Sequence, residues 1–433
     1  MTTCVIDLND DELRVASNTE IVVQAPGCAA LVEGEIRLGE PALRLAQRQP
    51  RTSENRHWRD LSLAPIDHLG PRARHYADLA WLQLEQLRRL AGNPAEAVLA
   101  VPGSFSPEQL SLLLGVAQSG GLRVTALVDS AVAAGAAALA RGAWLHLDLQ
   151  LHQAVLTRLA IDAEVRREAV EVLPGLGTQR LRTLCLEEAC AAFVREARFD
   201  PLHHADAEAL VLERLPNWLD GLRHAAELQV ALDHEGRRFQ ARLHRARLVE
   251  ATSPVLQQLR AALPAGLPAV ASHRLGRQPG FQECFPGTAV LPPRATFQGC
   301  RAAEIRAATS TGGLPLQTVL TAAAAPSIQP PSRPSPASVA THLLAGVEAI
   351  AVGGQALHLL PDGAAQTSPL PGTAARVEAT AAGLQILPFG PGRVLLNGTP
   401  IGAASGLAPG DRVSFVHGNG YFTAIRVRAG DAA

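Results

Sequence analysis

A proline-rich stretch near residue 330 sets the strongest limit on how this chain folds. Residues 322–337 carry five prolines among alanine and small polar residues. Such a composition buries too little apolar surface to form a packed core, so we expect an extended linker at residues 322–338. The sequence therefore predicts two domains, at residues 1–321 and 339–433.

The charge balance narrows the class of partner. The 433 residues include 39 basic and 40 acidic side chains, for a net charge of −1. This balance argues against a surface for nucleic acid or for anionic membranes. No run approaches the roughly 20 apolar residues of a membrane span, and the first residues lack a basic or apolar leader. We expect a cytoplasmic protein with protein partners, no nucleic acid and no membrane insertion.

The basic residues and cysteines exclude several chemistries. All 39 basic residues are arginine. A chain without lysine forms no Schiff base and has no lysine to contact a nucleotide phosphate. The six cysteines form no CxxC pair and have no histidine at zinc-ligand spacing. We expect reduced, partly buried thiols and no metal site.

Short apolar runs alternate with helical patterns before the linker. Residues 97–102 form an apolar run that ends in Pro-Gly, as a buried strand does. Ser106-Pro-Glu-Gln then supplies an N-cap, a proline at the first helical position and an acid in the first turn. We also expect helices at residues 130–141, 178–197, 211–228 and 245–262. The alternation predicts an α/β fold with a largely parallel sheet.

The order of these elements resembles the nucleotide-binding domain of the seventy-kilodalton heat-shock (DnaK) family, within the actin-like ATPase superfamily. The resemblance covers roughly residues 3 to 310 and rests on order more than on any single motif. The segments that carry it are residues 98–102, 106–109, 121–134, 147–149, 174–181 and 239–250. It implies a two-lobed actin-like (ribonuclease-H-like) domain with a nucleotide cleft.

The two phosphate hairpins of that family depart from its pattern here. Glycine-rich hairpins let backbone N–H groups approach a phosphate. Asp7 matches the first aspartate of the family, but Asn9-Asp10-Asp11 stands where Gly-Thr-Thr is expected. Asp148 matches in the second hairpin, followed by Gln150-Leu151-His152 in place of a glycine run. The added carboxylates repel a triphosphate, and we expect no basic residue in the hairpins to offset them.

The remaining contacts implied by the resemblance are also altered. Asp129 takes the place of a glutamate that closes the cleft. Ala226 and Gln229 stand for the Glu and Lys of an adenosine-clamping helix, and Ser272-His273 for a Gly-Gly pair. We expect a vestigial nucleotide cleft with no catalytic residue, formed by Asp7, Asn9, Asp129, Asp148, Gln150, Gly175, Gly177 and Ser272.

The same residues also allow simpler, structural interpretations. Carboxylates at strand ends, such as Asp7 and Asp148, often act as turn or cap residues. Residues 10–12 are expected to form a solvated hairpin tip, and His152 and His273 to be exposed or hydrogen-bonded loop residues. The group His203-His204-Ala-Asp206 lacks partners for a metal. Five arginines are expected on one solvated face: Arg237, Arg238, Arg242, Arg245 and Arg247.

After the linker, seven short apolar runs about ten residues apart predict a β-sandwich. Its end, residues 394–401 and 407–413, resembles that of forkhead-associated domains, with Asn397 and Gly398 at the matching Asn-Gly loop. That family reads phosphothreonine through Arg and Ser. Here Pro361-Asp362, Pro371 and Ala374 stand at its Arg, Ser and His positions. We therefore expect a protein-interaction module without phosphopeptide recognition.

Three functions remain open from the sequence. The first is a non-catalytic, DnaK-like scaffold that presents the forkhead-associated-like domain to protein partners and binds no cofactor. The second is a divergent magnesium-dependent ATPase in which Asp7 and Asp148 hold the metal-bound nucleotide. The third, a chaperone, is weakest because the residues after the linker lack a long helical lid.

Overall fold

The computed structural model of the chain divides into two compact units, Met1–Pro330 and Pro331–Ala433. The boundary falls inside the stretch predicted as a linker. In the first unit the structure describes residues 4–46, 48–264, 266–303, 314–323 and 326–329. In the second it describes residues 342–345, 348–352, 356–362, 364–368, 372–380, 383–389, 393–416, 418 and 420–425.

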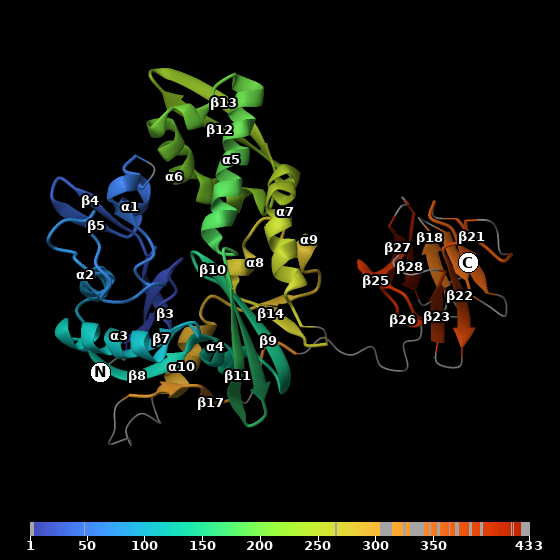
Figure 1. The fold of residues 1–433 in the computed structure, drawn as a ribbon, viewed down its shortest axis with the longest axis horizontal. Coiled ribbons are helices and arrows are strands. Elements are labelled where there is room, and N and C mark those ends of the chain that lie inside the picture. Colours follow the sequence, from blue (N-terminus) through green and yellow to red (C-terminus); the bar gives the residue numbers. More distant parts are fainter. Residues whose placement is uncertain are drawn as a thin grey trace. The chain divides into compact units, whose positions relative to one another are not determined.

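The first unit contains two six-stranded sheets (Figure 1). The first sheet has the order β16-β8-β7-β1-β2-β3. Its strands are β1 (Cys4–Asp7), β2 (Leu13–Ser17), β3 (Glu20–Ala25), β7 (Glu96–Val101), β8 (Arg123–Asp129) and β16 (Leu316–Gln317). Strands β1 to β3 are antiparallel, and β7 and β8 continue from β1 in parallel.

The second sheet repeats this arrangement, with the order β15-β14-β9-β10-β11-β17. Its strands are β9 (Gly142–Leu149), β10 (Gln153–Ile161), β11 (Glu164–Pro174), β14 (Ala269–Ala271), β15 (Ala289–Val290) and β17 (Val319–Thr321). Strands β9 to β11 are antiparallel, and β14 and β15 continue from β9 in parallel. The α/β prediction is confirmed. The prediction of a largely parallel sheet holds for the first sheet, where β16, β8, β7 and β1 pair in parallel. It is wrong for the second sheet, where β9, β10, β11 and β17 pair antiparallel.

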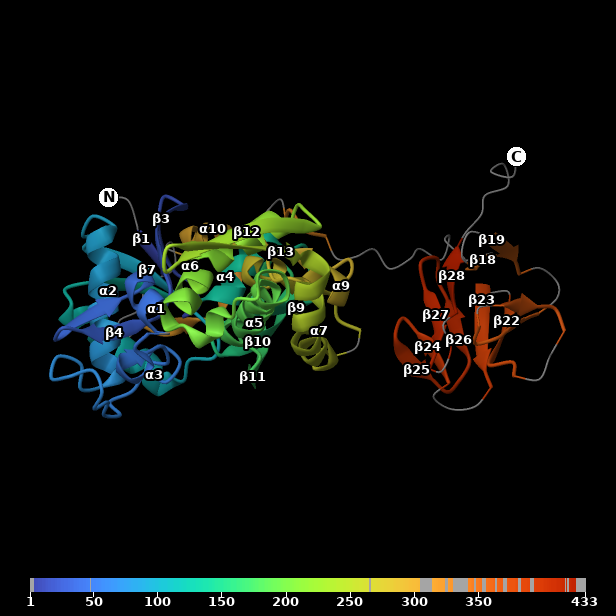
Figure 2. The same cartoon turned by 90° about the horizontal axis from the view of Figure 1, so that it is seen from above.

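Two small-residue helices, α4 (Ser130–Ala138) and α10 (Ala295–Ala303), pack in the core that both sheets share. Their backbones approach so closely that a Cβ on Gly299 would overlap the carbonyl of Ala133. On its other face the first sheet packs against α2 (Tyr76–Leu90) and α3 (Pro107–Ser119), and the second sheet against α7 (Arg245–Ala261). Figure 2 shows α2 and α3 at one side of the unit and α7 at the other.

Each sheet carries an additional subdomain. The first subdomain is a small sheet, β4 (Ala29–Val32), β5 (Glu35–Leu38) and β6 (Ser53–Glu54), with helix α1 (Glu40–Leu45). The second subdomain has α5 (Thr178–Ala197), α6 (Ala205–Leu222) and the hairpin β12 (Glu227–His234) and β13 (Arg237–His244). We call residues 4–129 the first lobe and residues 142–303 the second lobe.

Two expected boundaries differ from the structure. The helix expected at residues 211–228 is α6, which ends at Leu222, and residues 227–234 form β12. Asp220 and Gly221 end the helical pattern, and the alternating apolar residues Leu228, Val230 and Leu232 favour a strand. Part of the predicted linker also packs on the first unit: Ile328 N donates to Ala138 O at 2.8 Å, and Ala140 N donates to Ile328 O at 2.9 Å.

The second unit has two antiparallel sheets around one core. One sheet contains β18 (His342–Ala345), β19 (Glu348–Ala351), β24 (Val394–Leu396), β25 (Thr399–Ile401), β27 (Arg412–Phe415) and β28 (Tyr421–Ile425). The other contains β20 (Leu357–Leu359), β21 (Ala365–Gln366), β22 (Ala375–Thr380), β23 (Gly383–Pro388) and β26 (Ser405–Leu407). The predicted sandwich is confirmed for the described residues.

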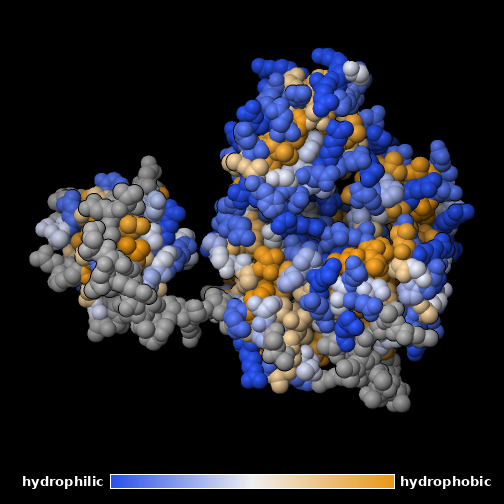
Figure 3. Space-filling view, turned by 180° about the vertical axis from the view of Figure 1, so that it is seen from behind, coloured by the Kyte–Doolittle hydropathy of each residue, from blue (hydrophilic) through white to orange (hydrophobic). Residues whose placement is uncertain are grey.

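The surface of the first unit has mixed polarity (Figure 3). On the face of the first unit in Figure 3, hydrophobic residues lie in several patches separated by hydrophilic ones. Among the described residues, no helix is long and apolar enough to cross a membrane.

Candidate functional site

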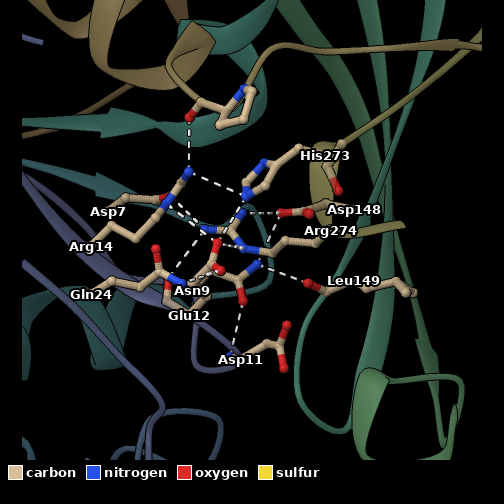
Figure 4. Close-up of polar contacts among 12 residues, drawn as sticks. Asp7, Asn9, Asp11, Glu12, Arg14, Gln24, Asp148, Leu149, His273 and Arg274 are labelled. Atoms are coloured by element: carbon tan, nitrogen blue, oxygen red, sulfur yellow. Dashed lines mark hydrogen bonds and ion pairs between the residues drawn. The ribbon is translucent and has the colours of Figure 1, made fainter. Parts of the chain in front are cut away.

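The tips of two hairpins, one from each lobe, meet between the sheets. The tip between β1 and β2 contains Asn9, whose Nδ2 donates to Asp148 Oδ2 at 3.0 Å and to Leu149 O at 2.9 Å (Figure 4). In return, Leu151 N in the tip between β9 and β10 donates to Asp10 Oδ1 at 2.7 Å. The contacts join positions about 140 residues apart in the chain. They close the space that two glycine-rich hairpins would leave open.

Asp7, at the end of β1, holds two arginines. Arg14 Nη2 in β2 and Arg274 Nη2 in α8 (His273–Gly276) each lie 2.7 Å from Asp7 Oδ2 (Figure 4). Arg274 also lies 3.6 Å from Asp148 Oδ2. Both guanidinium groups are buried, with side chains 1% and 4% exposed. Although burial alone raises the pKa of Asp7, the charges of Arg274 and Arg14 outweigh it and hold that pKa below its ordinary value.

Glu12 joins the first hairpin to the start of α8. Its Oε2 lies 2.8 Å from His273 Nε2, and its Oε1 accepts a hydrogen bond from Arg277 Nη1 at 2.7 Å. Gln24 Nε2 donates to the same Oε1 at 2.7 Å. Burial alone raises the pKa of Glu12, but the His273 hydrogen bond and the charges of Arg274 and Arg277 lower it well below its ordinary value.

Asp11 joins the same hairpin to α5. Its Oδ1 accepts hydrogen bonds from Thr178 Oγ1 at 2.6 Å and from Arg182 Nη2 at 3.0 Å. Arg277 Nη2 lies 3.5 Å from Asp11 Oδ2. We call the residues that join the lobes in this way the charge network: Asp7, Asp11, Glu12, Arg14, Asp148, Arg182, His273, Arg274 and Arg277.

Two expectations about the hairpin tip are wrong. Asp10, Asp11 and Glu12 are buried, at 3%, 6% and 4% exposure, rather than solvated. Basic residues do offset these acids, because Arg14 follows in the same hairpin and Arg274 arrives from the second lobe. Three consecutive carboxylates stay buried here only because the second lobe supplies their partners.

The other predicted site residues are engaged in hydrogen bonds within the protein. Asp129 caps α4 through hydrogen bonds from Ala131 N and Val132 N, and Arg167 Nη1 donates to it at 2.8 Å from the second sheet. Gln150 Oε1 accepts a hydrogen bond from Gln153 Nε2. Ser272 caps α8.

The two glycines before α5 also have structural roles. Gly175 adopts φ +77°, a backbone conformation that favours glycine, and its N–H donates to His152 O. A Cβ on Gly177 would overlap Leu151 O in the second hairpin tip. This pair therefore seats the start of α5 on the hairpin.

Ala226 and Gln229 do not lie on a helix, contrary to expectation. Gln229 is in β12 and Ala226 lies just before it. Both expected histidines are hydrogen-bonded: His152 to Asn55 at 3.0 Å, and His273 within the charge network.

A magnesium-bound nucleotide does not fit these residues. The two carboxylates that would hold the metal, Asp7 and Asp148, are paired to Arg274. Asp11 and Glu12 in the adjacent space already hold Arg182, Arg277 and His273, so these cations are engaged within the chain. The described residues contain no group of three or more His, Cys, Asp or Glu placed to hold a metal ion.

An open cleft of about 430 Å³ remains beside the charge network. Asp11, Arg182 and Arg277 form one wall, and Leu215 and Leu219 of α6 contribute apolar surface. Two further lining residues, Arg44 of α1 and Glu213 of α6, form an ion pair, with Nη1 and Oε1 3.2 Å apart. This volume falls within the range of small-molecule pockets.

In the second unit, Asn397 and Gly398 form the turn of the β24–β25 hairpin, at φ 53° and 82°. The Asn397 amide is engaged on both sides: Nδ2 donates to Asp411 Oδ1, and Oδ1 accepts from Arg412 N. Asp362 is exposed in a turn, Ala374 is buried, and Pro371 lies outside the described residues. The Asn397 side chain therefore holds the last strands together.

The sequence interpretation named the acids of the charge network and His273 but gave no role to its arginines. Those arginines are Arg14, Arg182, Arg274 and Arg277. An arginine inside the apolar strand Leu13–Ser17, close to three consecutive acids, was the available signal. Comparison of the chain with protein-family models and with curated proteins found no match.

Proposed function

We propose that the chain is a non-catalytic scaffold. Its first unit is a DnaK-like, actin-type domain whose nucleotide cleft is replaced by internal ion pairs. Its second unit is a forkhead-associated-like module that contacts protein partners. The observation that carries this proposal is the pairing of Arg274 with both Asp7 and Asp148.

The strand order supports the actin-type assignment. Both sheets have three antiparallel strands followed by two parallel ones, and each turns its first hairpin toward the other sheet. In actin-like ATPases the phosphates lie between two such hairpins. Here Asp11 and Glu12 occupy that region, with Arg182, Arg277 and His273 as their partners. The chain thus provides its own anionic groups where a ligand would bring phosphates.

The same network supports a scaffold rather than an enzyme. An ATPase cycle opens and closes its lobes as nucleotide enters and leaves. Opening these lobes would break the ion pairs of Asp11 with Arg182 and of Glu12 with Arg277, which already join the closed lobes. The closed state therefore requires no nucleotide.

The test is thermal unfolding with millimolar magnesium-ATP or magnesium-ADP. A ligand that binds only the folded state stabilises it by about 2.7 kcal/mol at a hundredfold excess over Kd. We expect no shift in Tm. A shift of several degrees that disappears in Asp148→Asn would overturn the proposal.

A second candidate, the divergent ATPase, is favoured by the open cleft of about 430 Å³ beside the network. If that cleft holds nucleotide, Leu219→Arg in its wall should abolish the shift. A shift that Leu219→Arg abolishes would show that nucleotide binds in this cleft, and phosphate release from ATP by the same chain would then support the ATPase.

A further inference from the structure

Asp10 is a buried acid at the contact between the two lobes. It is 3% exposed, and its Oδ1 accepts the hydrogen bond from Leu151 N. Its Oδ2 is buried and has no hydrogen-bond partner among the described residues. Asp7, Asp11 and Glu12 each bond to a cation from the second lobe. Asp10 differs from them because its only bond across the lobes is to a backbone amide.

The charged and titratable groups around Asp10 come from four elements. Asp11 is its neighbour in the hairpin, and Arg59 lies in the loop before α2. Arg274 is in α8, and Cys28 directly precedes β4. Arg59 is bonded to Asp60 at 2.6 Å and Arg274 to Asp7 at 2.7 Å. Neither guanidinium bonds to Asp10, so an ionised Asp10 stays buried beside the negative charge of Asp11.

We propose that Asp10 is a pH-dependent latch between the lobes: protonated, it lets the hairpin tips stay in contact, and ionised, it favours their separation. This inference does not depend on whether the cleft binds nucleotide. The contact between the hairpin tips then depends on the protonation of Asp10 as well as on the charge network.

The direction of the effect follows from linkage. Burial raises the pKa of Asp10 to about 7, although the Leu151 hydrogen bond lowers it. When the tips separate, water returns that pKa to its ordinary value near 3.8. The closed form therefore binds the proton more tightly. As the pH rises from about 4 to about 7, the closed-to-open equilibrium constant falls by up to about tenfold per pH unit. Above that range it no longer changes.

Other groups act in the opposite direction. His152 bonds to Asn55 and His273 to Glu12 across the lobes. Burial lowers the pKa of both histidines, so their neutral imidazoles favour the closed form as the pH rises. The contribution of Asp10 is therefore isolated by comparison with Asp10→Asn, which keeps the oxygen that accepts the Leu151 hydrogen bond but does not ionise.

The experiment uses fluorescence energy transfer between labels on Leu63→Cys in the first lobe and Leu202→Cys in the second. These positions are 66% and 43% exposed, whereas the six native cysteines are buried and remain unlabelled. Between pH 5 and pH 7, we expect the closed-to-open ratio of the wild type to fall by about fiftyfold relative to Asp10→Asn. Identical pH profiles for the two proteins would overturn the latch.

A measurement on the unsubstituted chain covers the case in which Asp10→Asn fails to fold. Carbon-13 NMR of the Asp10 carboxyl should give an apparent pKa near 7. A value near 4 would overturn the proposal, because the closed form would then bind no extra proton.

Discussion

Arg274 Nη2 lies 2.7 Å from Asp7 Oδ2, although 267 positions separate the two residues in the chain. The contact joins the end of β1 to the start of α8, and the side chains are 4% and 2% exposed. Both charges are removed from water, so each depends on the other for its stability. This pair is the centre of the network that joins the lobes.

Removing Arg274 should be strongly destabilising. Arg274→Met leaves Asp7 and Glu12 short of a cation in a buried setting. We expect the free energy of unfolding to fall by about 3–5 kcal/mol, measured by urea denaturation. Arg247→Ala is the control, because its pair with Glu250 is exposed and contributes at most about 1 kcal/mol. Equal losses in the two variants would contradict the network's role.

Gly177 tests the seating of α5 on the second hairpin. In Gly177→Ala the new Cβ overlaps Leu151 O, and we expect a loss of about 1–3 kcal/mol. Gly115 in α3 is the matched control, because a Cβ there meets no atom within 4 Å. Gly115→Ala should stabilise the chain by about 0.5–1 kcal/mol through helix propensity. Similar urea midpoints for both variants would show that the hairpin moves aside.

Glu12 should make the chain sensitive to acid. Its pKa is lowered in the folded state, so its stabilising effect is present above its ordinary value of 4.5 and is lost as the pH falls below it. We expect the urea midpoint of the wild type to fall more steeply than that of Glu12→Gln between about pH 5 and pH 3. Parallel profiles would mean that Glu12 ionises alike in the folded and unfolded chains.

Limited proteolysis should divide the chain after residue 329. The prolines of residues 330–336 predict an accessible segment, whereas Ile328 is hydrogen-bonded to Ala138 and Ala140. Proteinase K should leave a large fragment that ends after Gln329 and a small one that begins within residues 331–341. Mass spectrometry identifies the ends. Earlier cleavage within residues 95–160 would contradict the fold.

The second unit should not discriminate phosphorylated peptides. Asn397 is engaged by Asp411 and Arg412, and the proposed forkhead-associated resemblance puts Asp362 at the position of that family's arginine. A phosphothreonine peptide and its unphosphorylated form should bind equally in fluorescence titrations. A preference of about tenfold, roughly 1.4 kcal/mol, would restore the phosphopeptide function.

Local sequence determined many individual elements. Ser106 and Gln109 form the capping box of α3, with Ser106 Oγ accepting from Gln109 N and Gln109 Oε1 from Ser106 N. Asn397-Gly398 forms the hairpin turn that such a pair favours. These features need only residues a few positions apart, so the sequence suffices to predict them.

Only the tertiary structure decided the state of the candidate site. Asp10, Asp11 and Glu12 have the composition of a solvated tip, and Arg14 beside them does not by itself predict that all three are buried. The partners of Asp11 and Glu12 include Thr178, Arg182, Arg274 and Arg277, and Asp10 accepts from the Leu151 amide. The folding of the second lobe brings all of these groups to the hairpin. A carboxylate is buried when a distant cation compensates for the loss of water. The sequence therefore determined the hairpins, and the packing of one lobe on the other determined that their charges face each other.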